Sequence, residues 1–502
     1  MNNLSRTQNS KRNILLSVAN QILTILLSFA SRTVFIYFLG AEYLGLNGLF
    51  SNILSVLSLS ELGISSAMTF SMYKPLADGN KQSISALITF YKKLYSIVGA
   101  VIAALGLTIL PFLSFIVNGE EQVSNIHIYY LLFLANSVSS YFFTYKTSVI
   151  IADQKEYTLK VLNMAAAAAT FVIQYIVLLI MRSFAAYLIV QLVVSVALNA
   201  VCAAKAERMY PYIKEKQELP SEEKRTIFDN VKSFFAYHLG SVVLNNIDNI
   251  LISILINTIT VGIYSNYNLI ITKISSITQL FFTSIQSSIG NLNTDASAER
   301  KYDLFKLLCF VQFWIYGFCS ICFCVLFQDF IVLWLGENFL IDKVSMYMGI
   351  ATFYIQGYLY PIWCFRNTTG LFRQAKYIML PAAAINLVLS IIMGIKFGLA
   401  GILAATVIAR LLTNMWFEPY TLFKKYFFKP VSRYFIKQFF QVLLVIGIIF
   451  IIEFGFSFAA IDSPILLFSA KLIVCLIVPN GIFFIMFRKT DEFKTIIKKI
   501  MH

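Results

Sequence analysis

The stretch at 244–256, LNNIDNILISILI, is apolar enough to cross a membrane but carries a polar cluster. The cluster consists of Asn245, Asn246, Asp248 and Asn249. A carboxylate at the centre of a transmembrane helix costs about 2.5–3.5 kcal/mol on insertion scales, so such a group usually faces a hydrated cavity or pairs with another charge. Amide and carboxylate side chains in a cavity could bind the hydroxyl groups of a polar substrate.

Two cations also lie within apolar stretches. Lys273 lies about eleven residues into its stretch, too deep to reach the surface easily, and it is therefore a candidate to hold a substrate anion. Arg32 could face the same cavity, where it would lie opposite Asp248, or it could extend to the outer interface; both interpretations stay open. Glu61 and Arg410 are further charges well inside apolar stretches.

Residues three or four apart share one face of a helix, and this spacing places polar residues in stripes on the first, second, seventh and eighth apolar stretches. Small polar residues also occur at interfaces in any membrane bundle, where they bond across helices. Four stripes together with buried charges favour a hydrated cavity instead. The candidate cavity residues are Arg32, Lys273, Asp248, Asn245, Asn249, Ser28, Ser31, Asn268, Thr272 and Gln279, with Glu61, His238 and Arg410 as possible cavity or gating charges.

The elements that must position these residues are transmembrane helices. The chain of 502 residues is 58% hydrophobic and 13% charged, whereas soluble domains are about 25% charged. Segments of about 20 apolar residues, enough to cross a bilayer, recur from end to end. The sequence predicts fourteen spans, at 13–38, 46–72, 84–117, 126–151, 158–181, 184–204, 231–256, 262–290, 304–334, 345–365, 376–396, 399–422, 434–456 and 463–487.

The basic residues predict the orientation. With fourteen spans and the N-terminus inside, only Arg182, Lys343 and Lys396 fall on the outer side, as the positive-inside rule expects. The net charge of +15 therefore reflects the topology, and the anionic inner leaflet is the expected partner of the basic residues. No nucleic acid is expected as a partner. Both termini are predicted to be cytoplasmic, and the first span is expected to stay uncleaved in the mature protein.

An internal repeat organises the spans. When the sequence is shifted by 217, Gly45 falls on Gly262, and at a shift of 220, Gln154 falls on Gln374. Six spans per copy enter the membrane the same way up, as in transporters built from parallel repeats. The predicted domains are a six-helix lobe at 1–204, a cytoplasmic linker at 205–230, a second six-helix lobe at 231–425, and helices 13–14 with a cytoplasmic tail at 426–502.

Several function classes find no support in the sequence. The run from Cys319 to Cys324 lacks a neighbouring His or carboxylate, so its cysteines are interpreted as packing residues and no metal or disulfide is expected. There is no phosphate-binding loop of the type GxxxxGK[ST], and no loop offers a defensible catalytic triad or carboxylate pair. The sequence predicts no cofactor and no enzymatic activity. Without an ATPase domain, the energy for any transport must come from an ion gradient, the membrane potential or the substrate gradient.

One region carries a family resemblance. Residues 32–50, RTVFIYFLGAEYLGLNGLF, followed by SLSELGISSA at 58–67, resemble the first two helices of Wzx-type polysaccharide flippases. These flippases belong to the multidrug/oligosaccharidyl-lipid/polysaccharide exporter superfamily. The shared elements are Arg32 before Leu39-Gly40, the following Tyr43-Leu44-Gly45, and Leu62-Gly63 after a carboxylate; the DNILIS stretch and the 6+6+2 arrangement fit as well.

The resemblance implies a fold and a function. The expected fold is an all-α integral membrane protein of two pseudo-symmetric, MATE-like six-helix lobes with an appended helix pair. The implied substrate is a polyprenyl-pyrophosphate-linked oligosaccharide, moved to the outer leaflet for assembly of capsule, O-antigen or teichoic-acid polymers. Arg32 is the motif residue that carries over. Some flippases of this superfamily have several arginines in the first two helices; this chain has one, which argues against a peptidoglycan-precursor flippase.

Two alternatives remain at the level of sequence. A drug or organic-cation antiporter on the same fold would require acidic cavity walls and aromatic cages, whereas the candidate charges here are mixed. A multi-span glycosyltransferase or polymerase would require a large outer loop. The expected location is the bacterial plasma membrane. The expected partners are the lipid-linked substrate, membrane lipids, and possible polymerase and glycosyltransferase proteins.

Overall fold

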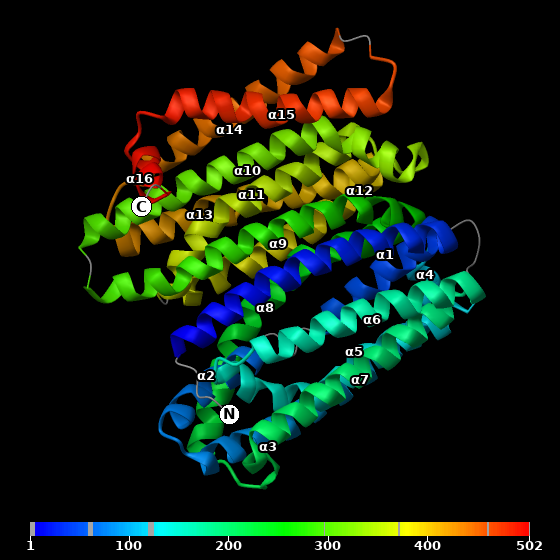
Figure 1. Cartoon of the computed structure of the whole chain (residues 1–502), viewed down its shortest axis with the longest axis vertical. Coiled ribbons are helices and arrows are strands. Elements are labelled where there is room, and N and C mark those ends of the chain that lie inside the picture. Colours follow the sequence, from blue (N-terminus) through cyan, green and yellow to red (C-terminus); the bar gives the residue numbers. More distant parts are fainter. Residues whose placement is uncertain are drawn as a thin grey trace. The chain divides into compact units, whose positions relative to one another are not determined.

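The protein is helical throughout its described residues (Figure 1). The computed structural model describes residues 6–58, 64–118, 125–295, 297–369, 372–458 and 461–500. A helix satisfies every backbone hydrogen bond within its own segment, which is what a chain in a hydrocarbon environment requires. The predicted all-α class is therefore confirmed.

The first half of the chain contains seven α-helices and two short 3₁₀ turns before the linker, counted within the described residues. They are α1 (Arg6–Leu57), α2 (Ile64–Ala77), α3 (Lys81–Ile109), η2 (Leu110–Phe112), α4 (Leu113–Ile116), α5 (Ile126–Ala152), α6 (Tyr157–Met181), α7 (Phe184–Met209) and η3 (Pro211–Lys214).

The second half begins at α8 and ends with a helix that the sequence analysis assigned only to a tail. Its elements are α8 (Ser221–Leu255), α9 (Thr258–Asp295), α10 (Ala298–Leu335), η4 (Glu337–Phe339), α11 (Lys343–Thr368), α12 (Phe372–Leu412), α13 (Asn414–Leu422), η5 (Phe423–Phe427), α14 (Ser432–Ser457), α15 (Pro464–Phe487) and α16 (Asp491–Ile500). The last of these, α16, packs its Phe493 ring on Trp314, and its Glu492 pairs with Lys437 at 3.0 Å.

Each predicted span lies on one helix, on part of a kinked helix or across consecutive helices. Nine helices among the described residues are long and apolar enough to cross a membrane, and two of these, at Leu15–Leu57 and Ile378–Phe427, are long enough to hold two predicted spans each. The second predicted span is divided between the end of α1 and α2, with 59–63 outside the described residues. The hydropathy pattern thus found the helices.

Two of the long helices each contain a sharp kink, and each kink divides the helix into two predicted spans. Gly40 has φ 82° and ψ −176° inside α1, and Gly398 has φ 58° and ψ −136° inside α12. Side chains with a Cβ atom rarely adopt such angles, so glycine is the residue that permits the chain to turn there. Each break occurs where the sequence analysis ends one span and begins the next.

The repeat recurs in the local structure. Asn80 and Ser297, which the shift of 217 relates, are the N-caps of α3 and α10, and each side chain accepts a hydrogen bond from the backbone N–H three residues on. Asn125 and Asp342 are related by the same shift and precede α5 and α11. The two copies therefore begin their corresponding helices at corresponding residues.

Two glycines related by the same shift meet at a close crossing, the Gly45–Gly262 seam. A Cβ atom on Gly45 would lie 2.0 Å from the carbonyl oxygen of Thr258, and one on Gly262 would lie 2.2 Å from that of Ala41. Ala41 and Thr258 are themselves equivalent positions of the two copies, so the contact is reciprocal. Small residues spaced by four allow membrane helices to approach this closely.

The chain divides by its internal contacts into two compact units, residues 1–262 and 263–502. Helix α8 groups with the first unit, where it packs against α1, α2 and α4. In the second unit, the appended helices α14 and α15 pack on α10. The lobe boundaries at 204 and 231, which follow the repeat and not the contacts, stay a prediction.

Candidate functional site

The α1 and α8 polar stripes belong to neighbouring helices of the first unit. Arg32 is half-buried on α1 and interacts with Tyr187 on α7. Tyr187 also lies within interaction range of Ser31, the neighbour of Arg32, and of Gln174 on α6. The guanidinium therefore lies within interaction range of a phenol, and its place in a cavity or at the outer interface stays a prediction.

The opening cluster on α8 changes from exposed to buried along the helix. Asn245 is exposed, Asp248 is half-buried, and Asn249 is 8% exposed. The Asn245 amide donates to the carbonyl of Ser241 at 2.6 Å, within its own helix. The exposed end of the cluster is therefore accessible, as a cavity wall requires.

The end of α8 is fixed to the segment after α4 by several hydrogen bonds. Ser253 donates to the carbonyl of Ile116 at 2.8 Å, and the Thr258 amide donates to the carbonyl of Asn118 at 2.7 Å. Ser253 and Thr258 also share a hydrogen bond at 2.9 Å. These contacts tie the junction of α8 and α9, a few residues after the Asp248 cluster, to the end of α4.

Hydroxyl groups of the stripes bond to their own helices. Ser28 donates to the Thr24 carbonyl at 2.6 Å, and Thr272 donates to the Asn268 carbonyl at 2.8 Å. This bond satisfies the only proton of each hydroxyl and leaves lone pairs free to accept. The stripes are therefore suited to accept hydrogen bonds from a ligand rich in hydroxyl groups.

At the start of α1, Asn13 and Ser17 continue the three- and four-residue spacing of Ser28 and Ser31, but these two residues have a packing role instead. The Asn13 amide donates to the carbonyl of Gln154 at 2.9 Å, and its oxygen accepts from the Tyr157 amide at 2.7 Å. Ser17 accepts from Lys160 at 2.5 Å. Gln154 is one of the residues that the shift of 220 relates to the second copy, so a residue of the repeat takes part in this α1–α6 joint.

In the second unit, the α9 stripe is left uncovered by its own unit. Thr272 and Gln279 are exposed, while Asn268 and Lys273 are half-buried. Lys273 also accepts, through its backbone carbonyl, a hydrogen bond from Ser276 at 2.7 Å. An open polar face on an otherwise apolar helix is what a cavity wall would present.

The remaining predicted residues have varied positions. Glu61 and the side chain of His238 lie outside the described part of the structure. Arg410 is 4% exposed within α12, so it is enclosed by the second unit. Its predicted role as a cavity or gating charge stays a prediction, as do those of the other candidates.

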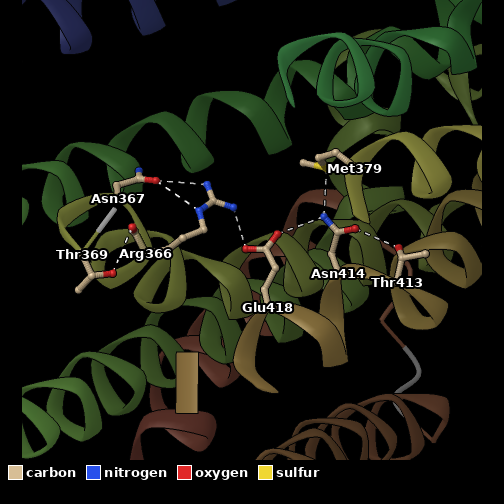
Figure 2. A network of polar contacts seen from close by, with 7 residues as sticks. All are labelled: Arg366, Asn367, Thr369, Met379, Thr413, Asn414 and Glu418. Atoms are coloured by element: carbon tan, nitrogen blue, oxygen red, sulfur yellow. Dashed lines mark hydrogen bonds and ion pairs between the residues drawn. The ribbon is translucent and has the colours of Figure 1, made fainter. Parts of the chain in front are cut away.

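The sequence analysis missed a buried polar network in the second unit (Figure 2). Arg366 at the end of α11 donates to Glu418 on α13 at 2.8 Å, and their side chains are 9% and 1% exposed. Asn414, one helical turn before Glu418, donates to the same carboxylate at 3.3 Å. Figure 2 shows the Arg366 guanidinium between Glu418 and Asn367, with Asn414 continuing the chain of contacts toward Thr413.

A signal for this network was present in the sequence. Glu418 lies inside the predicted span 399–422, where an isolated carboxylate requires a partner. Arg366 falls just beyond the span 345–365 and was assigned to a loop. The helix extends to Thr368, which brings the arginine onto the same joint.

The geometry described so far is that of a bundle of long apolar helices that carry polar residues on α1, α8 and α9. No protein-family model and no curated protein matches the chain. Among solved structures, the lipid II flippase MurJ in an inward closed conformation matches with TM-score 0.70 and 14% identity, covering 95% of this chain and 99% of that one. An inward-facing multidrug resistance MATE family transporter of the MOP superfamily matches with TM-score 0.62 and 13% identity, covering 80% and 97%. A mutant of the Vibrio cholerae MATE transporter VcmN matches with TM-score 0.60 and 15% identity, covering 85% and 100%.

The chain has the fold of the MOP-superfamily transporters. The predicted MATE-like architecture is thereby confirmed, and the protein is a multi-pass membrane protein. The superfamily expected from the residues around Arg32 is supported at the level of fold, while the Wzx-type subgroup is a finer prediction.

Proposed function

We propose that the protein translocates a polyprenyl-pyrophosphate-linked oligosaccharide from the cytoplasmic to the outer leaflet by alternating access. The observation that carries this proposal is the extent of the match to the lipid II flippase, which covers 95% of the chain. The two MATE transporters cover 80% and 85%. A lipid-linked substrate is therefore favoured over a soluble one.

The candidate residues suit the three chemical parts of such a substrate. Lys273 and Arg32 would attract the pyrophosphate, since cationic side chains bind phosphate oxygens through charge-assisted hydrogen bonds. The stripe hydroxyls, with their protons already used, would accept hydrogen bonds from the sugars. The polyprenyl tail would stay in the bilayer while the lobes rock about the bound headgroup.

A drug or organic-cation antiporter is the second candidate, because two structural neighbours are structures of a multidrug resistance MATE family transporter. Such a protein would use Asp248 to bind a cation and would not need Lys273. The two functions therefore make opposite demands on the same two side chains.

Substituting Lys273 separates these functions. If Lys273 binds the pyrophosphate, Lys273→Ala abolishes export and causes a complete lipid-linked glycan to accumulate on the cytoplasmic side, while Lys273→Arg retains part of the activity. Lys396→Ala, which removes an exposed lysine from the predicted outer side, is the matched control and leaves export unchanged. Normal export by Lys273→Ala would overturn the assignment, and unchanged glycolipids with new dye sensitivity in a deletion strain would favour the antiporter.

A double-mutant cycle tests the second pair of candidates. Asp248→Asn and Arg32→Gln should each impair export, and the double variant should lose less than the sum of the two losses, because charges that pair are not additive. The measurement is export rate at equal membrane abundance. Strict additivity would leave Asp248 as a cavity-wall residue that does not pair with Arg32.

A further inference from the structure

A cavity of about 990 Å³ lies on the first unit, away from the candidate residues of the transport path. Its walls come from α3, α5, α7 and the linker that begins at η3. Five lysines and two glutamates line it: Lys92, Lys93, Lys146, Lys214, Lys216, Glu207 and Glu218. We call this cavity the lysine pocket.

Two of the lysines share one carboxylate within the pocket, which balances one of their two charges. Glu207 lies between Lys146, at 2.6 Å, and Lys214, at 3.2 Å. Among the described residues, no carboxylate forms an ion pair with the ammonium groups of Lys92, Lys93 or Lys216, all of which are exposed. Lysines on a solvated face point away from one another, whereas these converge from two separate segments on one hollow. The pocket thus has an excess of positive charge.

The linker wall of the pocket is held in place. The hydroxyl of Ser85 on α3 donates to the carbonyl of Glu215, and Thr89 donates to the same carbonyl at 3.5 Å. Ile213 and Leu219 on either side are 6% and 4% exposed, so they anchor the linker by burial. Lys214 and Lys216 are therefore presented to α3 from an ordered segment.

The pocket borders the N-terminal half of a helix that is longer than the hydrocarbon core requires, which would set the pocket at the level of the lipid headgroups. The helix through α3 and α4 has 36 residues, whereas about 20 suffice to cross the hydrocarbon core. Directly after Lys93, the residues Ile97, Val101 and Leu105 recur every four positions and are 61%, 45% and 47% exposed. This spacing places them in one lipid-facing stripe, which starts at the wall of the lysine pocket.

We propose that the lysine pocket binds the phosphate headgroup of an anionic glycerophospholipid, whose acyl chains lie along the α3 stripe. A phosphate there would join Lys92 and Lys93 to Lys216, and so fasten the linker to α3. Free phosphate or pyrophosphate has the same anionic groups but no apolar part that could contact the α3 stripe. Because the cationic pocket and the apolar stripe are adjacent, they favour a phospholipid over free phosphate.

The test uses the full-length protein in nanodiscs of phosphatidylcholine, with or without phosphatidylglycerol. Retained phosphatidylglycerol is counted by native mass spectrometry, and hydrogen exchange is followed over residues 211–220. Each basic residue at an anionic surface contributes about fivefold in affinity, so Lys92→Gln/Lys93→Gln/Lys216→Gln is expected to weaken binding roughly a hundredfold. The corresponding triple arginine variant retains binding and shows that the fold is intact.

The control removes the same charge elsewhere, as Lys81→Gln/Lys425→Gln/Lys489→Gln, three exposed lysines outside the pocket. This variant should retain phosphatidylglycerol and the slow exchange of the linker. Equal losses in the pocket and control variants would reduce the effect to bulk charge and overturn the site. Inorganic pyrophosphate that slows exchange in pure phosphatidylcholine as strongly as phosphatidylglycerol does would overturn the lipid assignment.

Discussion

Each copy of the repeat has an ion pair between the helices that carry its fourth and sixth predicted spans, but the two pairs lie in different surroundings. In the first copy, Lys146 on α5 pairs with Glu207 on α7 at 2.6 Å, and each side chain is 25% exposed. In the second copy, Arg366 on α11 pairs with Glu418 on α13, and both are nearly inaccessible. Under the shift of 217 that relates the starts of α5 and α11, Lys146 falls on Trp363, so Arg366 lies about one helical turn beyond the equivalent position.

The difference shows how burial decides what partners an ion pair requires. The half-buried pair remains accessible to solvent, so a lysine with a single ammonium group is sufficient, and Glu207 is shared with Lys214. The buried pair must satisfy every donor and acceptor within the protein. An arginine provides the additional donors, and Asn414 and Asn367 occupy the remaining positions.

The largest expected effect comes from breaking the buried pair. Glu418→Gln leaves the Arg366 charge buried without its counter-ion, and removing one partner of such a pair costs about 3–5 kcal/mol. We expect a lower midpoint of thermal unfolding in detergent, with reduced abundance in the membrane. The double variant Arg366→Met/Glu418→Leu should recover most of the loss, because it leaves no buried charge. A single variant as stable as the wild type would show that water enters the joint.

The Gly45–Gly262 seam provides a test in which the two copies should respond alike. A Cβ atom at either position overlaps a backbone carbonyl oxygen, so Gly45→Ala and Gly262→Ala must push the helices apart. Overpacking of this kind costs about 1–3 kcal/mol. The expected result is a similar fall in unfolding midpoint for both.

Gly48→Ala is the matched control for the seam. Its Cβ would meet only Val261 Cγ1 at 3.5 Å, an ordinary van der Waals distance. Alanine is favoured over glycine in a helix by about 1 kcal/mol, so this variant should be as stable as the wild type or slightly more stable. Equal destabilisation by all three alanines would contradict a role for close approach.

The smallest effect is expected at the more accessible pair, Lys146 and Glu207. Glu207→Gln removes an interaction of a kind that contributes about 0–1 kcal/mol, because water and salt screen it. Its unfolding midpoint should differ little from that of the wild type, and added salt should reduce even that difference. A loss as large as that of Glu418→Gln would mean that the first joint is as dry as the second.

Much of the architecture was predictable, because the hydropathy pattern and the repeat each depend on many residues, so no single residue decides them. The spans coincide with helices, and the shift of 217 reappears in the caps at Asn80 and Ser297. The breaks at Gly40 and Gly398 fall between predicted spans, although the chain continues there as a kinked helix. The sequence alone could not distinguish a kink from a loop, since a glycine suits either.

The site was less predictable, since polar residues on one face of a helix have more than one use. Asn13 and Ser17 belong to the same stripe as Ser28, yet they join α1 to α6. Tyr187, the neighbour of Arg32, comes from a helix distant in sequence, and no spacing rule connects them. Arg366 and Glu418 are likewise distant in sequence. The sequence could therefore indicate only that Glu418 needs a partner, and not which residue provides it.

The Gly45–Gly262 seam also bears on the origin of the chain. Position 45 meets position 258, and position 262 meets position 41, so the contact maps onto itself when the two copies are exchanged. Such self-complementarity is the property of an isologous homodimer interface. A six-helix ancestor that paired with a second molecule through this surface would, after gene duplication and fusion, leave both halves of the interface within one polypeptide.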